Sequence, residues 1–187
     1  MKRIPKKDFF TIPNLIGYLR ILLIPVFCWV YLHEKNGMLA TAIVLFSSFT
    51  DLFDGMIARK FNQVTELGKF LDPLADKLTH AALALCLATR YPLMWALLAL
   101  MAVKEGYMAL MGMKLLKVGK KLDGAMWFGK VCTATLFIGM VALFFFYDLP
   151  LAAANGIMIV MMAMMVFTLF SYVPVFRRMQ EDGKEVK

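Results

Sequence analysis

Four aspartates occur at short, regular spacings in the stretch DLFDGMIARKFNQVTELGKFLDPLAD: Asp51, Asp54, Asp72 and Asp76. At 3.6 residues per helical turn, Asp51 and Asp54 fall within about 60° of arc on one helix. On the next helix, Gly68, Asp72 and Asp76 fall within about 80°. The segment between them allows the two helices to run antiparallel, so we expect their acidic faces to meet.

Converging carboxylates limit the chemistry of such a site. Four of them in a low dielectric cannot all stay ionised without a counter-charge. Oxygen ligands suit hard divalent cations, and Mg²⁺ or Mn²⁺ fits better than zinc. Four aspartates are enough for two ions, and paired ions favour displacement at phosphorus because they neutralise a diphosphate and its leaving group. We therefore predict that Asp51, Asp54, Asp72 and Asp76 are metal ligands.

Small residues and one arginine accompany the aspartates. Gly55, Ala58 and Gly68 leave one side of each helix bare, so a flat nucleotide or another backbone can approach. Close helix packing in a membrane explains the same residues equally well. Arg59 is suited to a phosphate oxygen because its guanidinium forms bidentate charged bonds. The alternative is an arginine that reaches the membrane surface and sets topology.

The elements that carry these residues are predicted to be membrane helices. Apolar residues make up 61% of the 187-residue chain and charged residues 18%, whereas a soluble domain has about a half and a quarter. Residues 149–176 contain no charged side chain, and about 20 such residues cross a hydrocarbon core about 30 Å thick. Several runs of this kind argue against a soluble domain.

Six apolar segments are predicted to span the membrane, at residues 12–32, 38–58, 68–89, 93–113, 125–147 and 151–176. Turn-forming pairs separate several of them: Asn36-Gly37, Tyr91-Pro92 and Leu149-Pro150. No repeat or linker marks a second domain, so we predict one all-α integral membrane domain over residues 1–187, with its motif at 51–76. The cysteines stand singly, without the spacing of a zinc site or a disulfide framework: Cys28, Cys86 and Cys132.

The positive charge lies in short clusters between and outside the apolar segments. This distribution argues against nucleic acid as a partner, despite a net charge of +8. With a cytoplasmic N-terminus, fourteen basic residues fall inside: Lys2, Arg3, Lys6, Lys7, Arg59, Lys60, Lys114, Lys117, Lys120, Lys121, Arg177, Arg178, Lys184 and Lys187. Only Lys35 and Arg90 fall outside. The positive-inside rule then predicts a multi-pass protein of the inner or plasma membrane, with both termini and the active site towards the cytoplasm. Residues up to Phe10 either form a short interfacial helix or stay disordered.

The aspartate stretch resembles the signature of the CDP-alcohol phosphotransferase family, D-x2-D-G-x2-A-R-x8-G-x3-D-x3-D. All eight fixed positions are filled at the right spacing: Asp51, Asp54, Gly55, Ala58, Arg59, Gly68, Asp72 and Asp76. The layout of six spans, with the motif on the second and third, is also similar to that of the family.

The resemblance implies a role for each of these residues. Asp76 would be the general base as well as a metal ligand. The CDP site would be lined by Asp51, Gly55, Ala58, Arg59 and Gly68. The resemblance further implies that an alcohol attacks the lipid-side phosphate of CDP-diacylglycerol, that CMP leaves, and that the protein forms homodimers among membrane lipids.

The opening TIPNLIGYLRILLIPVF looks like that of phosphatidylglycerophosphate synthases within the family. This likeness implies glycerol 3-phosphate as the acceptor. Basic residues in or beside the spans can bind such a phosphorylated alcohol or form ion pairs within the protein: Arg20, Lys104 and Lys130. Two positions depart from that group's pattern and bear on the acceptor: Lys104 stands where an arginine is common, and Leu136 where a glutamine is expected.

Other functions fit parts of the sequence. Cardiolipin synthases share much of the opening, and phosphatidylinositol-phosphate synthases share the catalytic motif. A membrane cation transporter is the alternative from another class, because transporters also place acidic residues in spans. Here the acids cluster towards one interface beside Arg59, which a cation pathway does not need.

Overall fold

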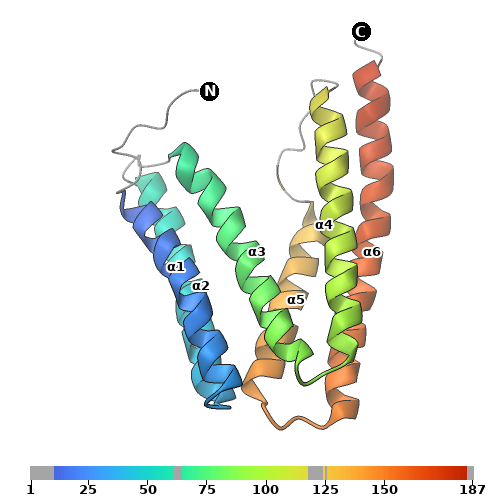
Figure 1. The fold of residues 1–187 in the computed structure, drawn as a ribbon. Helices are drawn as coiled ribbons and strands as arrows, with labels where there is room; N and C mark the ends of the chain where they lie inside the picture. Colours follow the sequence, from blue (N-terminus) through green and yellow to red (C-terminus); the bar gives the residue numbers. More distant parts are fainter. Residues whose placement is uncertain (1–10, 61–64, 118–123, 125, 185–187) are drawn as a thin grey trace. The chain divides into compact units, whose positions relative to one another are not determined.

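The computed structural model describes residues 11–60, 65–117, 124 and 126–184. The first ten residues, for which the sequence allows either an interfacial helix or disorder, lie outside this range. The described residues form six helices and contain no strand (Figure 1): α1 (Ile12–Leu32), α2 (Gly37–Lys60), α3 (Glu66–Ala88), α4 (Leu93–Lys117), α5 (Trp127–Phe145) and α6 (Leu151–Lys184). The all-α prediction is confirmed. The α6 helix continues past the predicted span because helix-forming charged residues follow the apolar run.

Four helices are long and apolar enough to cross a membrane, over Asn14–Leu32, Leu93–Leu116, Trp127–Phe145 and Leu151–Glu181. The chain is therefore a multi-pass membrane protein. In α2 the apolar part, Gly37–Asp51, is shorter, and α3 is not among these spans. Both helices carry the aspartates, which lower the apolar character of one end of each.

A tight connection joins α1 to α2. Lys35 adopts a left-handed backbone conformation with a φ of 53°. Asn36 follows, and its Oδ1 accepts the backbone N–H of Leu39 at 3.0 Å, as a residue preceding a helix commonly does. A Cβ on Gly37 would overlap the carbonyl oxygen of Phe144. The Asn36-Gly37 pair thus serves both the turn and a close helix contact.

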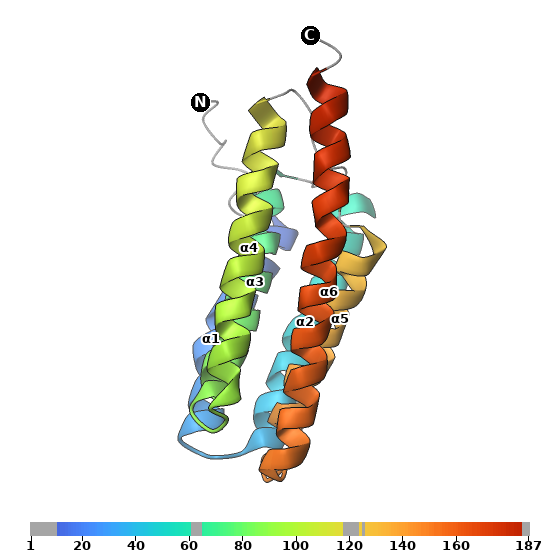
Figure 2. The same cartoon turned by 90° about the vertical axis from the view of Figure 1, so that its right-hand side faces the viewer.

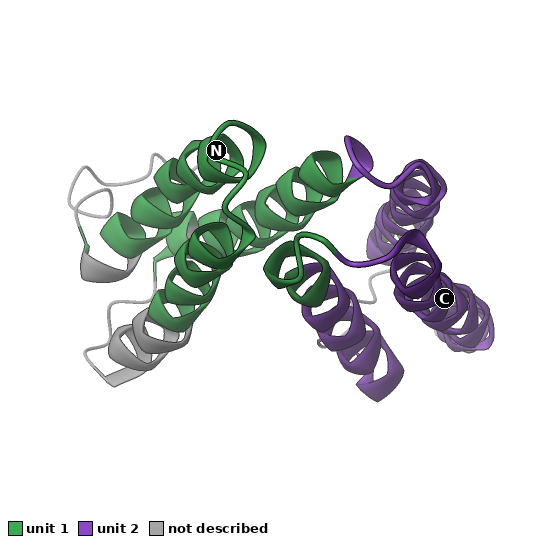
Figure 3. Ribbon diagram, turned by 90° about the horizontal axis from the view of Figure 1, so that it is seen from below, with its two compact units in different colours: residues 1–87, 141–148 green, residues 88–140, 149–187 purple. Residues whose placement is uncertain are grey.

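The chain divides into two compact units, shown in Figure 3. Unit 1 comprises the described residues up to Leu87 together with Val141–Asp148. Within it, α1 packs along α2. The ring of Tyr31 stacks on Phe144 with centroids 4.0 Å apart, and Phe27 meets Phe144 edge-on at 6.1 Å. The last turn of α5 therefore belongs to the core of unit 1.

The cysteines are free thiols, as predicted. Cys86 and Cys132 are buried and Cys28 is half-buried. The thiols of Cys28 on α1 and Cys86 on α3 lie close enough to interact. This pairing adds a contact between α1 and α3 that the separation in sequence does not reveal.

Unit 2 comprises Ala88–Met140 and the described residues from Leu149 onwards. In it α4 packs along α6 (Figure 2), around a buried cluster of Leu115, Phe128, Tyr172 and Phe176. The rings of Phe128 and Tyr172 meet edge-on at 4.7 Å. A Cβ on Gly129 would overlap the Tyr172 hydroxyl, so this glycine permits the close approach of α5 and α6.

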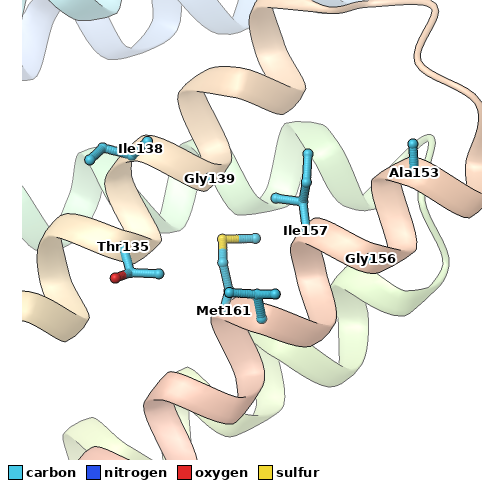
Figure 4. A pocket seen from close by; sticks show the side chains of 8 residues that line it. Thr135, Ile138, Gly139, Ala153, Gly156, Ile157 and Met161 are labelled. Carbon is cyan, nitrogen blue, oxygen red and sulfur yellow. The ribbon is translucent and has the colours of Figure 1, made fainter.

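An open apolar groove of about 530 Å³ runs along α5 and α6 in unit 2. Figure 4 shows Thr135 and Gly139 on one side of it and Gly156 and Met161 on the other. The Thr135 hydroxyl donates to the Val131 carbonyl of its own helix at 2.9 Å. The groove therefore offers hydrocarbon surface rather than polar groups.

Candidate active site

Three helices of unit 1 carry the charged residues of the candidate site: Arg20 on α1, Asp51 on α2, and Asp72 and Asp76 on α3. Asp51 lies where the apolar part of α2 ends. The α2 and α3 helices run antiparallel, as predicted (Figure 1). Because α3 follows α2 in the chain and runs in the opposite direction, the C-terminal end of α2 and the N-terminal half of α3 can lie together.

Arg20 joins the two acidic helices. Its side chain is only 4% exposed. Nη1 of Arg20 donates to Oδ1 of Asp51, and Nη2 donates to Oδ1 of Asp76 at 2.5 Å. A guanidinium is planar and permanently charged, with its donors in a fork, so it can serve two carboxylates at once. Arg20 thus supplies a counter-charge that the aspartates require.

The cluster is buried on the arginine side and open on the carboxylate side. The Asp51 side chain is 32% exposed and that of Asp76 is 53% exposed. A buried guanidinium is stable only while it is paired. Nε of Arg20 has no hydrogen-bond partner among the described residues, so its pairing depends on the two aspartates. Because Asp76 is half-exposed and bonds to Arg20 through one oxygen, it remains accessible to a substrate.

Asp72 lies one turn before Asp76 on α3 and is exposed. It interacts electrostatically with both Arg20 and Asp76. Two carboxylates one helical turn apart repel each other, and the nearby guanidinium offsets part of that repulsion. A further cation at this end of α3 would be attracted for the same reason.

The donor set fits a hard divalent cation such as Mg²⁺ or Mn²⁺, since it consists of carboxylate oxygens. Asp51 and Asp76 come from different helices yet both reach one guanidinium, so one cation can meet both. Among the described side chains, no three metal-binding groups are close enough together to hold one ion. Asp54 is the remaining member of the predicted set, and its side chain lies outside the described residues.

The sequence as a whole decides the family. Residues 10–172 match the model of the CDP-alcohol phosphatidyltransferases. The chain belongs to the CDP-alcohol phosphatidyltransferase family. The match extends from the start of α1 into α6, so it includes both units. The chain is therefore an enzyme of this family and a transferase of phospholipid biosynthesis.

Several curated relatives are similar to this phosphatidyltransferase. A CDP-diacylglycerol–glycerol-3-phosphate 3-phosphatidyltransferase of Yersinia enterocolitica is 30% identical over 168 residues, 87% of this chain and 92% of that protein. One of Escherichia coli K12 is 35% identical over 136 residues, 70% of this chain and 75% of that protein. A cardiolipin synthase and hydrolase fusion protein of Schizosaccharomyces pombe is 41% identical over 85 residues, 46% of this chain and 14% of that protein.

Four residues of the family motif lie in the last turns of α2: Asp54, Gly55, Ala58 and Arg59. Their backbone is helical, as the spacing predicts. Their side chains lie outside the described residues. Their roles in binding metal and CDP therefore stay predictions.

Gly68 of the motif is buried in the first turn of α3. A Cβ placed on it would come within 2.8 Å of Asn14 Oδ1 and 3.2 Å of Thr65 Oγ1. Its bare side is therefore filled by two neighbouring side chains, and its contact with CDP stays a prediction. The sequence interpretation missed both neighbours. The available signal for Thr65 was its place immediately before a helix, where threonine is common.

The three basic residues proposed for the acceptor differ in their surroundings. Arg20 alone lies in unit 1 with the aspartates, and it is bound to them. Lys104 is 12% exposed on α4, and its Nζ donates to Oε1 of Glu105 at 3.0 Å. Lys130 is exposed near the start of α5. Of the two roles that the sequence allows for these residues, an ion pair within the protein is the one that Arg20 and Lys104 have in the structure.

Proposed function

We propose that this phosphatidyltransferase transfers the phosphatidyl group of CDP-diacylglycerol to glycerol 3-phosphate, giving phosphatidylglycerophosphate and CMP. The reaction class follows from the family. The acceptor is supported by one observation above all: relatives named for this reaction align over 70% to 87% of the chain.

The chemistry assigns the central step to α3. A hydroxyl oxygen of the acceptor attacks the lipid-side phosphorus, the bond to CMP breaks, and a base takes the hydroxyl proton. Asp76 suits this role because it is accessible while Arg20 fixes one of its oxygens. Asp51 is anchored by the same guanidinium, so the two carboxylates keep their relative positions during the transfer.

Metal and donor binding complete the proposed site. Mg²⁺ or Mn²⁺, with two ions in all, would be held by Asp51, Asp54, Asp72 and Asp76. Bound there, such ions neutralise the diphosphate of the donor and the phosphate of departing CMP. CDP would lie along the last turns of α2, against Asp51, Gly55, Ala58 and Arg59. Gly68 would support CDP binding without a direct contact, because Asn14 and Thr65 cover its open side.

Arg20, Lys104 and Lys130 stay the candidates for binding the acceptor phosphate. Arg20 is engaged by two aspartates and Lys104 by Glu105. Lys130 is exposed and forms no ion pair among the described residues. An accessible ammonium can bind a phosphate dianion without first breaking an internal ion pair.

We further propose that the active site faces the cytoplasm. The fourteen basic residues on one side of the predicted spans support this orientation, as the positive-inside rule requires. The family resemblance supports a homodimer and a single catalytic domain over residues 1–187.

Release of CMP from CDP-diacylglycerol tests the proposal. The purified protein is supplied in detergent with Mg²⁺ or Mn²⁺ and with separate acceptors: glycerol 3-phosphate, phosphatidylglycerol, inositol phosphate and serine. Release with glycerol 3-phosphate alone is expected. Release with a different acceptor alone would overturn the acceptor assignment. If a folded sample releases no CMP with any of these acceptors, the proposed reaction is overturned.

Cardiolipin synthesis is the second candidate. It is favoured by the segment that is 41% identical to the fusion protein of Schizosaccharomyces pombe. In that case phosphatidylglycerol, rather than glycerol 3-phosphate, would release CMP.

A further inference from the structure

Thr65 connects two helices at the start of α3. Its Oγ1 accepts the backbone N–H of Gly68 at 3.0 Å and thereby caps the helix. The same hydroxyl accepts from Nδ2 of Asn14 at 3.1 Å and donates to Oδ1 of Asn14 at 3.2 Å. One donor and two lone pairs are all that a hydroxyl offers. Thr65 is therefore fully used, and Asn14 on α1 is tied to the first turn of α3.

Contacts between α1 and α3 follow one another along both helices. Beyond the Asn14–Thr65 contact, a Cβ placed on Gly17 would be 3.7 Å from Cβ of Leu71. Three residues further along α1, Arg20 reaches Asp76. The Asn14–Thr65 contact thus begins a row of contacts that ends at the proposed base.

Gly68 allows the Asn14–Thr65 contact to form. Asn14 is 1% exposed and lies where a side chain at position 68 would begin, because a Cβ there would be 2.8 Å from its Oδ1. That distance is too short for a carbon and an oxygen that are not bonded. The glycine of the motif is thus explained by the proximity of α1, without a nucleotide against it.

We propose that Asn14 and Thr65 are positioning residues, which fix the placement of α3 against α1 so that Asp72 and Asp76 face Arg20 and the reacting groups. Their effect on the reaction is through the position of α3, and a displacement of about 1 Å in an active site can cost about 100-fold in rate. The proposal rests on the proposed function for its kinetic test.

Substitutions at Thr65 test the hydroxyl. Thr65→Val removes it at similar volume, and Thr65→Ser retains it. Thr135→Val is the matched control, because that hydroxyl bonds only to its own helix. We expect kcat for CMP release to fall about 10-fold to 100-fold in Thr65→Val, with Thr65→Ser and Thr135→Val within about threefold of wild type. The KM for CDP-diacylglycerol should stay near the wild-type value, since most of the proposed CDP contacts lie on α2.

Gly68 and Asn14 are tested together. Gly68→Ala should lower kcat because the new methyl group displaces Asn14. Adding Asn14→Ala should then cause no further loss, and the double variant should match Asn14→Ala alone. Independent effects that multiply in the double variant would show that Gly68 serves another purpose, such as nucleotide contact, and would overturn this part of the proposal.

Mn²⁺ affinity, measured without donor or acceptor, separates this proposal from the proposed function. We expect Thr65→Val to weaken Mn²⁺ binding about 10-fold, as the loss of a residue that orients metal ligands does, and Thr65→Ser to bind as wild type does. If the wild type releases no CMP, the proposed function fails. The positioning role is then judged from the Mn²⁺ affinity of Thr65→Val compared with that of the wild type. Unchanged kcat and Mn²⁺ affinity with a lower melting temperature would show a purely structural contact. If Thr65→Val does not fold, Asn14→Ala, which keeps the helix cap, takes its place.

Discussion

Nη2 of Arg20 donates to Oδ1 of Asp76 across 56 residues of sequence. The same guanidinium reaches Asp51, so one buried side chain pairs with carboxylates from two helices. Two of the proposed metal ligands, Asp51 and Asp76, are the carboxylates that pair with Arg20. Arg20 is therefore expected to affect both the packing of the three helices and the binding of metal ions to these aspartates.

Arg20→Gln is expected to destabilise the metal-free protein, because Asp51 and Asp76 lose their shared counter-charge. The melting temperature in EDTA should fall by about 2–4 °C for each kcal/mol lost, and Mn²⁺ should raise it more than in the wild type. Arg20→Lys should restore part of the loss, since an ammonium lacks the fork. Equal melting temperatures of wild type and Arg20→Gln in EDTA would contradict the counter-charge role.

Asp76→Asn is expected to remove the base while preserving the shape of the site. The kcat for CMP release should fall about 10²-fold to 10⁴-fold, while binding of CDP-diacylglycerol persists in an equilibrium assay. Asp148→Asn serves as the control, because Asp148 is exposed outside the motif. If Asp76→Asn kept a kcat close to that of the control, another residue would have to be the base.

Lys130→Ala is expected to raise the KM for glycerol 3-phosphate about 10-fold or more, through the loss of a charged hydrogen bond, with kcat for saturating acceptor less affected. Lys104→Met should instead change the melting temperature, since it breaks the pair with Glu105. Lys114→Ala, an exposed lysine on α4, is the control. An acceptor KM that changes with Lys104 and not with Lys130 would favour Lys104 as the phosphate-binding residue.

Gly129→Ala is expected to destabilise unit 2, because its Cβ would overlap the Tyr172 hydroxyl. Overpacking of this kind costs about 1–3 kcal/mol, measurable as a lower melting temperature in detergent. Tyr172→Phe in the same chain should recover much of the loss by removing the overlapping oxygen. Gly156→Ala is the control, since a Cβ there meets no atom within 4 Å. Equal losses for Gly129→Ala and Gly156→Ala would show that the overlap is not the cause.

The helices and the aspartate motif were predictable from the sequence. Long apolar runs leave little alternative to helices in a membrane, and the turns at Asn36 and Pro92 interrupt those runs where the structure places the connections. Four helices qualify as spans by length and composition, whereas α2 and α3 fall short. The charges that make the site recognisable are the same charges that weaken the apolar signal.

The partners of Arg20 were not predictable in the same way. Helical spacing relates residues on one helix, but the pairs of Arg20 with Asp51 and Asp76 depend on how three helices pack. The contact of Asn14 with Thr65 and Gly68 has the same origin. In both cases the sequence supplies a residue type, and tertiary packing supplies its partner.

The ion pairs of Arg20 have a consequence for biogenesis. A central aspartate or arginine costs about 2.5–3.5 kcal/mol when a segment enters the bilayer through the translocon, and α2 and α3 are the two helices that are weak spans by themselves. The α1 helix is synthesised before α2 and α3, and its Arg20 pairs with one aspartate of each. We therefore expect α2 and α3 to integrate efficiently only after α1 is in place, so that the order of synthesis itself assists insertion of the most polar helices.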